Sequence, residues 1–181
     1  MKPNLVQQGI TYGIITGLIF VVVSFGAWSV GDANSFVSIT GIANFIPYVF
    51  VILIIAGIKL RQQSDNKLSF QEALKFTFCA YVVYALIEAI SNYMLFAVID
   101  KDLTARVMEI SMQKALKMME KFGASQQQID EAIKKIQDEP KVTSFKQVFL
   151  GTGVSLIWNF VKSLLLSLII RREPKMEDQF N

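Results

Sequence analysis

The chain has 181 residues, a mean hydropathy of +0.42 and a formal net charge of +3, and only 18% of its residues are charged. Soluble domains usually have about a quarter of their residues charged. No charge occurs in residues 3–31 or in residues 33–58, and about 20 apolar helical residues are enough to cross the hydrocarbon core of a membrane. This pattern excludes an ordinary soluble domain and a disordered chain, and it predicts an all-α polytopic membrane protein.

The residue types that are missing limit the chemistry. There is no histidine, which is the commonest metal ligand and the usual proton carrier near neutral pH. The single cysteine, Cys79, lies in an apolar run and cannot form an internal disulfide. No Gly-rich phosphate loop is present, and the basic residues form no dense cluster of the kind that binds nucleic acid. We therefore predict no catalytic residue, metal or cofactor and no nucleic-acid partner, and we do not expect an enzyme.

The first two spans are predicted over residues 9–29 and 36–58. The first apolar run is longer than the core of a signal peptide and lacks small residues where cleavage would occur, so we expect it to be retained. The link over residues 31–35 is short, which makes the two helices antiparallel neighbours.

Small residues and a proline distinguish these two spans. Gly9, Gly13 and Gly17 are spaced by four, which lets two helix backbones approach closely. Their partner is either another span of the same chain or a second copy. Pro47 removes a backbone hydrogen bond and should bend the second span, with Asn44 and Tyr48 placed to satisfy the freed carbonyl.

The third and fourth spans are predicted over residues 76–99 and 148–170. Each follows a capping box, in which a hydroxyl and a longer polar side chain three residues on satisfy each other's backbone N–H groups. The pairs are Ser69 with Glu72 and Ser144 with Gln147. Lys and Arg cluster in residues 59–75, after residue 170 and at Lys2, which predicts that these segments and both termini are cytoplasmic.

The long loop between these spans reads as an extramembrane helical pair over residues 102–139. Gly123 should end the first helix, a Ser125–Gln128 capping box should begin the second, and Pro140 should end it. We expect the first helix to continue the third span outward as an extracytoplasmic stalk. Its methionines either pack on the returning helix or a second copy, or bind varied partners. The residues of its apolar stripe are Val107, Ile110, Met112, Ala115, Leu116, Met119 and Phe122, those of the second helix are Ile129, Ala132, Ile133 and Ile136, and the methionines are Met108, Met112, Met118 and Met119.

Two charged residues lie well inside apolar spans, where an isolated charge costs about 2.5–3.5 kcal/mol. Glu88 and Lys162 are predicted at similar depth on antiparallel helices, so we expect them to pair. The pair either fixes helix register or belongs to a proton or solute path; alternatively, Lys162 extends alone toward the cytoplasm. Polar residues at helical spacing accompany them, forming the candidate polar seam: Tyr81, Tyr84, Glu88 and Ser91 on the third span, and Thr152, Ser155, Asn159 and Lys162 on the fourth.

Several short segments together resemble a bacterial family catalogued as domain of unknown function 4199. The segments are residues 9–13, 44–48 around Pro47, 57–59 and 68–75, and the final span running into Arg171 and Arg172. Members of that family are small inner-membrane proteins with no established activity. The resemblance therefore implies a fold and a location in the bacterial inner membrane, and it implies no catalytic residues.

These observations favour a non-enzymatic structural or interaction protein that forms a single membrane domain over residues 1–181. Its expected partners are the lipid bilayer and either a second copy or another membrane or periplasmic protein, which would bind the Met-rich stalk. The alternative is a small transporter or channel that uses the Glu88/Lys162 seam.

Overall fold

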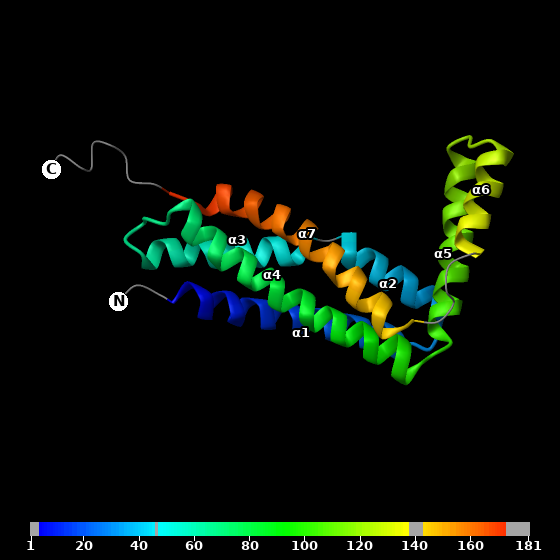
Figure 1. Cartoon of the computed structure of the whole chain (residues 1–181), viewed down its shortest axis with the longest axis horizontal. Helices are drawn as coiled ribbons and strands as arrows, with labels where there is room; N and C mark the ends of the chain where they lie inside the picture. The colour runs from blue at the N-terminus through cyan, green and yellow to red at the C-terminus, as the bar shows by residue number, and fades with distance from the viewer. Residues whose placement is uncertain (1–3, 46, 138–142, 173–181) are drawn as a thin grey trace. The chain divides into compact units, whose positions relative to one another are not determined.

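The computed structural model describes residues 4–45, 47–137 and 143–172, and the described chain is almost entirely helical (Figure 1). It folds into two compact units, Met1–Val22 with Ile46–Ile90 and Phe149–Asn181, and Val23–Phe45 with Ser91–Val148. The prediction of a single domain stays a prediction, and each unit is described by itself. The helices are α1 (Leu5–Ser29), α2 (Ala33–Phe45), α3 (Tyr48–Gln63), α4 (Phe70–Tyr93), the π-helix η1 (Met94–Ile99), α5 (Leu103–Lys121), α6 (Gln126–Gln137) and α7 (Phe145–Ile170).

Four helical segments are long and apolar enough to cross a membrane: Leu5–Ser29, Ala33–Gln63, Phe70–Ile99 and Phe145–Ile170. Their outer faces are apolar as well. Val22, Ile90 and Ile157, for example, are 71%, 65% and 67% exposed. Such faces suit a lipid environment and not water, so the chain is a multi-pass membrane protein.

The predicted capping boxes are confirmed. The backbone N–H of Ser69 donates to Glu72 Oε2 at 2.9 Å, and that of Ser144 donates to Gln147 Oε1 at 2.9 Å. In each box the reciprocal bond runs from the backbone N–H of the third residue to the serine hydroxyl, at 3.3 Å. These bonds satisfy backbone donors at the start of α4 and α7.

The second span is broken at Pro47, where we had expected a bend. Pro47 has φ −78° and ψ 51° and precedes α3, so α2 and α3 are separate helices. The Tyr48 hydroxyl is buried without a hydrogen-bond partner, so its predicted role of satisfying the freed carbonyl is wrong. The side chains of Asn44 and Ile136 lie outside the described part of the structure, as do the whole residues Lys2 and Pro140.

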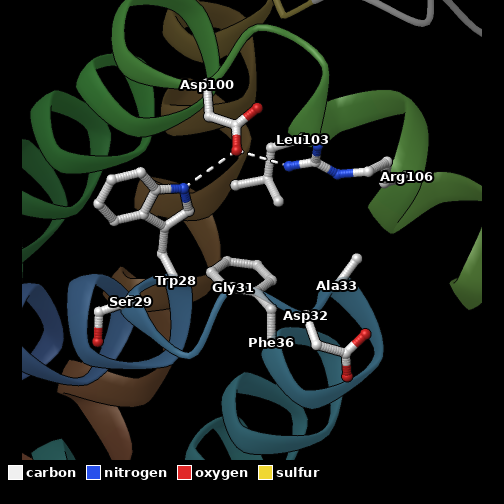
Figure 2. Close-up of a pocket in the computed structure, with 9 residues that line it drawn as sticks. All are labelled: Trp28, Ser29, Gly31, Asp32, Ala33, Phe36, Asp100, Leu103 and Arg106. Atoms are coloured by element: carbon white, nitrogen blue, oxygen red, sulfur yellow. Dashed lines mark hydrogen bonds and ion pairs between the residues drawn. The ribbon is translucent and has the colours of Figure 1, made fainter.

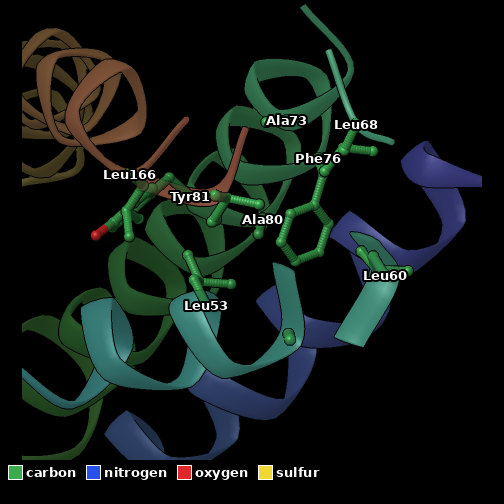
Figure 3. Close-up of a cluster of buried hydrophobic side chains, with 10 residues drawn as sticks. Leu53, Leu60, Leu68, Ala73, Phe76, Ala80, Tyr81 and Leu166 are labelled. Atoms are coloured by element: carbon green, nitrogen blue, oxygen red, sulfur yellow. The ribbon is translucent and has the colours of Figure 1, made fainter. Parts of the chain in front are cut away.

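The first unit has a core at the contact of α3, α4 and α7. Phe76, Leu53 and Leu166 are completely buried there, and Figure 3 shows them pointing toward one another. Hydrogen bonds join the chain segments at one end of this core. Arg61 Nη1 donates to the Ile170 carbonyl at 3.2 Å, and Leu68 and Arg172 exchange two backbone hydrogen bonds. A guanidinium at the carboxyl end of α7 also offsets the partial negative charge of that helix end.

The glycines at four-residue spacing lie against α4 of the same chain. A methyl group at Gly9 would lie 2.8 Å from the Phe76 carbonyl oxygen, and one at Gly17 would lie 2.9 Å from Ile87 Cβ. Figure 1 shows α1 running beside α4. Only a residue without a side chain permits this separation between two helix backbones.

The second unit packs the end of α1, α2 and η1 against α5. Ala27, Phe36, Leu95 and Leu103 form its core, and the rings of Phe36 and Phe96 meet edge to face at 5.9 Å. The prediction that the third span continues outward as a stalk is wrong. The helix stops at Asp100, which has φ −134° and ψ 84°, and α5 packs on α2, with Lys114 Nζ donating to Ser38 Oγ at 2.9 Å.

Helices α5 and α6 form the predicted pair. Gly123 ends the turn of α5 with φ +74°, which favours glycine. The backbone N–H of Ser125 donates to Gln128 Oε1 at 3.0 Å, which confirms the capping box, and Ile129 is buried. Phe122 was predicted to belong to the apolar stripe, but it lies at the end of α5 and is 84% exposed.

The close contact of α1 and α4 makes Gly13 sensitive to substitution. We expect Gly13→Ala to lower the free energy of unfolding in detergent by about 1–3 kcal/mol, since its methyl group would meet the Ala80 oxygen at 2.6 Å and Val83 Cβ at 2.7 Å. Gly26→Ala on the same helix is the control, because nothing lies within 4 Å of its new methyl group, and alanine favours a helix by about 0.5–1 kcal/mol over glycine. Equal effects of the two substitutions would contradict the close contact.

Candidate functional site

Three polar residues of the third span, Tyr81, Tyr84 and Glu88, lie on the part of α4 that belongs to the first unit. Tyr81 is buried, and Tyr84 and Glu88 are half-buried. The Tyr84 hydroxyl is within electrostatic reach of the Glu88 carboxyl group and of the hydroxyl of Tyr48, which begins α3. Tyr48 is not among the seam residues predicted from the sequence, although its place beside Pro47 brings it to this cluster. Tyr48, Tyr84 and Glu88 form the intramembrane polar cluster.

Lys162 lies beside this cluster without pairing directly with Glu88. Its Nζ donates to Asn159 Oδ1 at 3.4 Å and lies 6.0 Å from the centre of the Tyr81 ring. Its charge acts on Glu88 through space, but the structure, which describes both side chains, has no hydrogen bond or ion pair joining them. Lys162 is exposed on α7, so the expected contact pair is replaced by a longer-range interaction.

The reason for this displacement is the direction in which α7 is buried. Its most buried polar positions are Asn159, Ser163 and Ser167, which are spaced by four. At about 100° per residue, Lys162 lies about 80° from the middle of the face that these residues share with Leu166 and Ile170. Lys162 therefore lies at the edge of the buried face.

Hydroxyl contacts between α4 and α7 were not predicted from the sequence. Thr77 Oγ1 lies 3.1 Å from Ser167 Oγ and 3.3 Å from the Ser163 carbonyl oxygen, and all three residues are fully buried. The pattern that indicates these contacts is the four-residue spacing of small polar residues on α7. A second polar stripe on the same helix, the one that ends at Lys162, has a similar spacing and was chosen instead. Such contacts between hydroxyl groups hold membrane helices together.

The remaining seam residues differ in burial and in the unit to which they belong. Thr152 and Ser155 are half-buried on α7. Ser91 belongs to the second unit, and its buried hydroxyl has no hydrogen-bond partner. Asn159 is the seam residue of α7 that is also bonded to Lys162.

A second polar site lies in the second unit, where α1, the start of α2, η1 and α5 meet. Figure 2 shows the Asp100 carboxylate between Trp28 and Arg106. Trp28 Nε1 donates to Asp100 Oδ2 at 3.1 Å, and Arg106 Nη2 donates to the same oxygen at 2.6 Å. These residues border an open cavity of about 490 Å³, the interhelical pocket, whose other lining residues include Asp32, Ala33 and Phe36.

The π-helix η1 delivers Asp100 to this site. The backbone N–H of Asp100 donates to the Leu95 carbonyl, five residues earlier, at 2.9 Å. A π-helix is rare and often occurs at functional sites, because its extra residue redirects the side chains that follow. Neither η1 nor the hydrogen bond from Trp28, which joins residues 72 apart, was predicted from the sequence.

Both carboxylates of the pocket are held in the charged state. The hydrogen bond from Trp28 holds the pKa of Asp100 below its usual value, and Arg106 lowers it further. The backbone N–H and hydroxyl of Ser35 lower the pKa of Asp32, which caps the start of α2 through hydrogen bonds from the backbone N–H groups of Asn34 and Ser35. The pocket therefore contains two negative charges and one guanidinium.

A groove of about 520 Å³ runs along α5 in the same unit. Met108 and Met112, one turn apart on α5, line it with Phe96 of η1. The hydroxyl groups of Thr104 and Thr143 lie 2.8 Å apart at its border. We call this the methionine groove; its lining residues are Asn92, Phe96, Thr104, Val107, Met108, Ser111, Met112, Ala115 and Thr143.

The Asp100 network predicts a pH dependence. A carboxyl group with a lowered pKa stabilises the folded state above its unfolded value, and that contribution is lost as the pH falls through the folded value. In a Trp158→Phe background, where Trp28 is the remaining tryptophan, we expect constant emission from pH 5 to 8 and a transition below the ordinary aspartate value of 3.8.

Asp100→Asn should abolish this transition. Asp102→Asn, two residues further on, is the control, because Asp102 makes no side-chain bond to the start of α5. A midpoint above 3.8, or an unchanged transition in Asp100→Asn, would show that Trp28 does not report on this bond.

A family model described as protein of unknown function, DUF4199, matches residues 11–172 of the chain. No curated protein and no solved structure matches the chain.

Proposed function

The chain belongs to the DUF4199 family, and we propose that it is a non-enzymatic interaction protein of the bacterial inner membrane. In this proposal the α5–α6 pair binds an apolar helix of another membrane protein. The proposed orientation has both termini in the cytoplasm and the α5–α6 pair on the opposite side of the membrane. It rests on the Lys and Arg residues next to the spans, in residues 59–75 and after residue 170, because such residues are more frequent on the cytoplasmic side.

The methionine groove carries this proposal. Met108 and Met112 are half-buried and give the groove an adaptable apolar wall, which suits an apolar helix inserted along it. Further along α5, Met118 and Phe122 are 61% and 84% exposed. Large apolar side chains this exposed on an otherwise charged helix are typical of a surface that another protein covers.

The groove can be tested with a photoreactive amino acid placed at Met112 in the native membrane. We expect it to form a cross-linked product of one defined mass, because the side chain faces the bound helix. The control position is Lys117, which is exposed on the same helix and does not line the groove.

The mass of the product decides between occupants. A product from Met112 and not from Lys117, with the mass of the chain plus a different membrane protein, is the expected result. Equal cross-linking from both positions would contradict a specific groove. A product of two copies of this chain would assign the groove to self-association and overturn the proposed partner.

The intramembrane polar cluster favours a second candidate, a proton or cation pathway. The Tyr48 hydroxyl is buried and makes no hydrogen bond in the structure, but it is electrostatically coupled to the Tyr84 hydroxyl, which is coupled in the same way to the Glu88 carboxyl group. A chain of hydroxyl groups leading to a carboxyl group inside a span is an arrangement that passes or holds a cation.

Reconstitution into liposomes that contain a pH-sensitive dye tests this candidate. If the cluster conducts, Glu88→Gln should reduce the flux at least tenfold, because the amide cannot take up and release a proton. Asp100→Asn is the control, since Asp100 belongs to the other unit. Flux that is absent from the unmodified protein, or unchanged in Glu88→Gln, would reject the pathway.

A further inference from the structure

We propose that the interhelical pocket binds the headgroup of a phospholipid that carries both a phosphate and a primary ammonium group, with the chemistry of phosphatidylethanolamine. This goes beyond binding at the methionine groove and concerns a different ligand. It depends on the residues around Asp32, Asp100 and Arg106.

The position of the pocket points to a lipid. Within the second unit, the end of the first candidate span at Ser29, the start of the second at Ala33 and the end of the third at Ile99 all lie at or next to the pocket. The ends of membrane spans lie at the level of the lipid headgroups, where tryptophan is also favoured. Trp28 lines the pocket with its N–H group directed at Asp100. A ligand that enters here comes from the headgroup layer.

Arg106 supplies the phosphate contact. A guanidinium has five N–H donors, and the bond to Asp100 uses one of them. The Arg106 side chain is 51% exposed, while that of Asp100 is 21% exposed. The planar guanidinium group of Arg106 matches the oxygens of a phosphate better than a lysine ammonium group would. Asp100 therefore holds Arg106 at the pocket while leaving other guanidinium donors for a ligand.

The carboxylates select against an anionic lipid. Asp32 and Asp100 together outnumber the single guanidinium of the pocket, and Lys114, which also acts on Asp32 through space, is bonded to Ser38. Figure 2 shows Asp32 and Ala33 across the pocket from Arg106. A carboxylate can accept about four hydrogen bonds, and Asp32 accepts two from backbone N–H groups and also interacts with the Ser35 hydroxyl. The rest of its capacity suits a primary ammonium group, whereas a choline group has no N–H to donate.

The size and lining of the pocket fit this ligand. A volume of about 490 Å³ is within the usual range for small-molecule sites, which is about 300–1,000 Å³. Phe36 and Leu103 supply apolar surface beneath the charged groups. This arrangement places a headgroup next to its polar partners and leaves the acyl chains outside, among the apolar faces of the spans.

Native mass spectrometry of the purified full chain in detergent tests the proposal. The probes are phosphatidylethanolamine, phosphatidylcholine and phosphatidylglycerol with the same acyl chains, and water-soluble glycerophosphoethanolamine. We expect one saturable phosphatidylethanolamine site, at least tenfold tighter than for the other two lipids. Equal affinity for the three lipids would overturn the proposal. Equal affinity for the water-soluble compound would assign the pocket to a soluble zwitterion and overturn the lipid.

Two variants test the residues. Arg106→Gln should weaken phosphatidylethanolamine binding at least tenfold while keeping a donor for Asp100. Asp32→Asn keeps a residue that caps α2 well, and it should move the preference toward phosphatidylglycerol. Lys117→Gln, at an exposed position of α5 outside the pocket, is the control. Unchanged preference in Asp32→Asn, with helix content retained, would contradict the role of the carboxylate. None of these residues lines the methionine groove. A negative result in the lipid-binding experiment therefore does not affect the cross-linking test of the proposed function.

Discussion

The hydrocarbon core of a membrane offers no partners to backbone N–H and C=O groups, and most features of this chain follow from that constraint. A helix satisfies its own backbone except at its ends. The ends therefore concentrate the polar interactions. Ser69 and Ser144 satisfy donors at the starts of α4 and α7, Arg61 binds the last carbonyl of α7, and Asp32 caps α2. The pocket around Asp100 is a further such end, where the residues also leave room for a ligand.

Between the ends, the helices associate through small residues. Burial of apolar surface gives little advantage between helices that are surrounded by lipid. Close contact and buried hydroxyl groups take its place. Gly13 brings α1 against α4, Gly57 accommodates Ile170, and Thr77 meets Ser167. These contacts explain why small residues recur every four positions on the faces where helices meet, while large apolar residues occupy the exposed faces.

Interactions over short sequence distances could be predicted from the sequence. The capping boxes at Ser69, Ser125 and Ser144 depend on residues three apart, and the turn at Gly123 depends on one backbone angle. It was harder to predict which face of a helix is buried. The stripe that ends at Lys162 and the row through Asn159, Ser163 and Ser167 have similar periods, and only packing decides which one is buried.

The least predictable features depend on contacts distant in the sequence or on an irregular helix. The bond between Trp28 and Asp100 joins residues 72 apart, and η1 has no spacing pattern that distinguishes it from a continued α-helix. An uninterrupted helix through residues 94–102 would have produced the expected stalk. The extra residue in the turn of η1, followed by the stop at Asp100, lets α5 pack on α2 instead.

The break at Pro47 also bears on how the protein is inserted during biosynthesis. Helix α2 has 13 residues and α3 has 16, which correspond to about 20 and 24 Å, whereas the hydrocarbon core is about 30 Å thick. Neither half is long enough to span the bilayer by itself, so the translocation machinery must accept the two as one segment. The division between the two compact units at Phe45 and Ile46 therefore falls within one inserted segment.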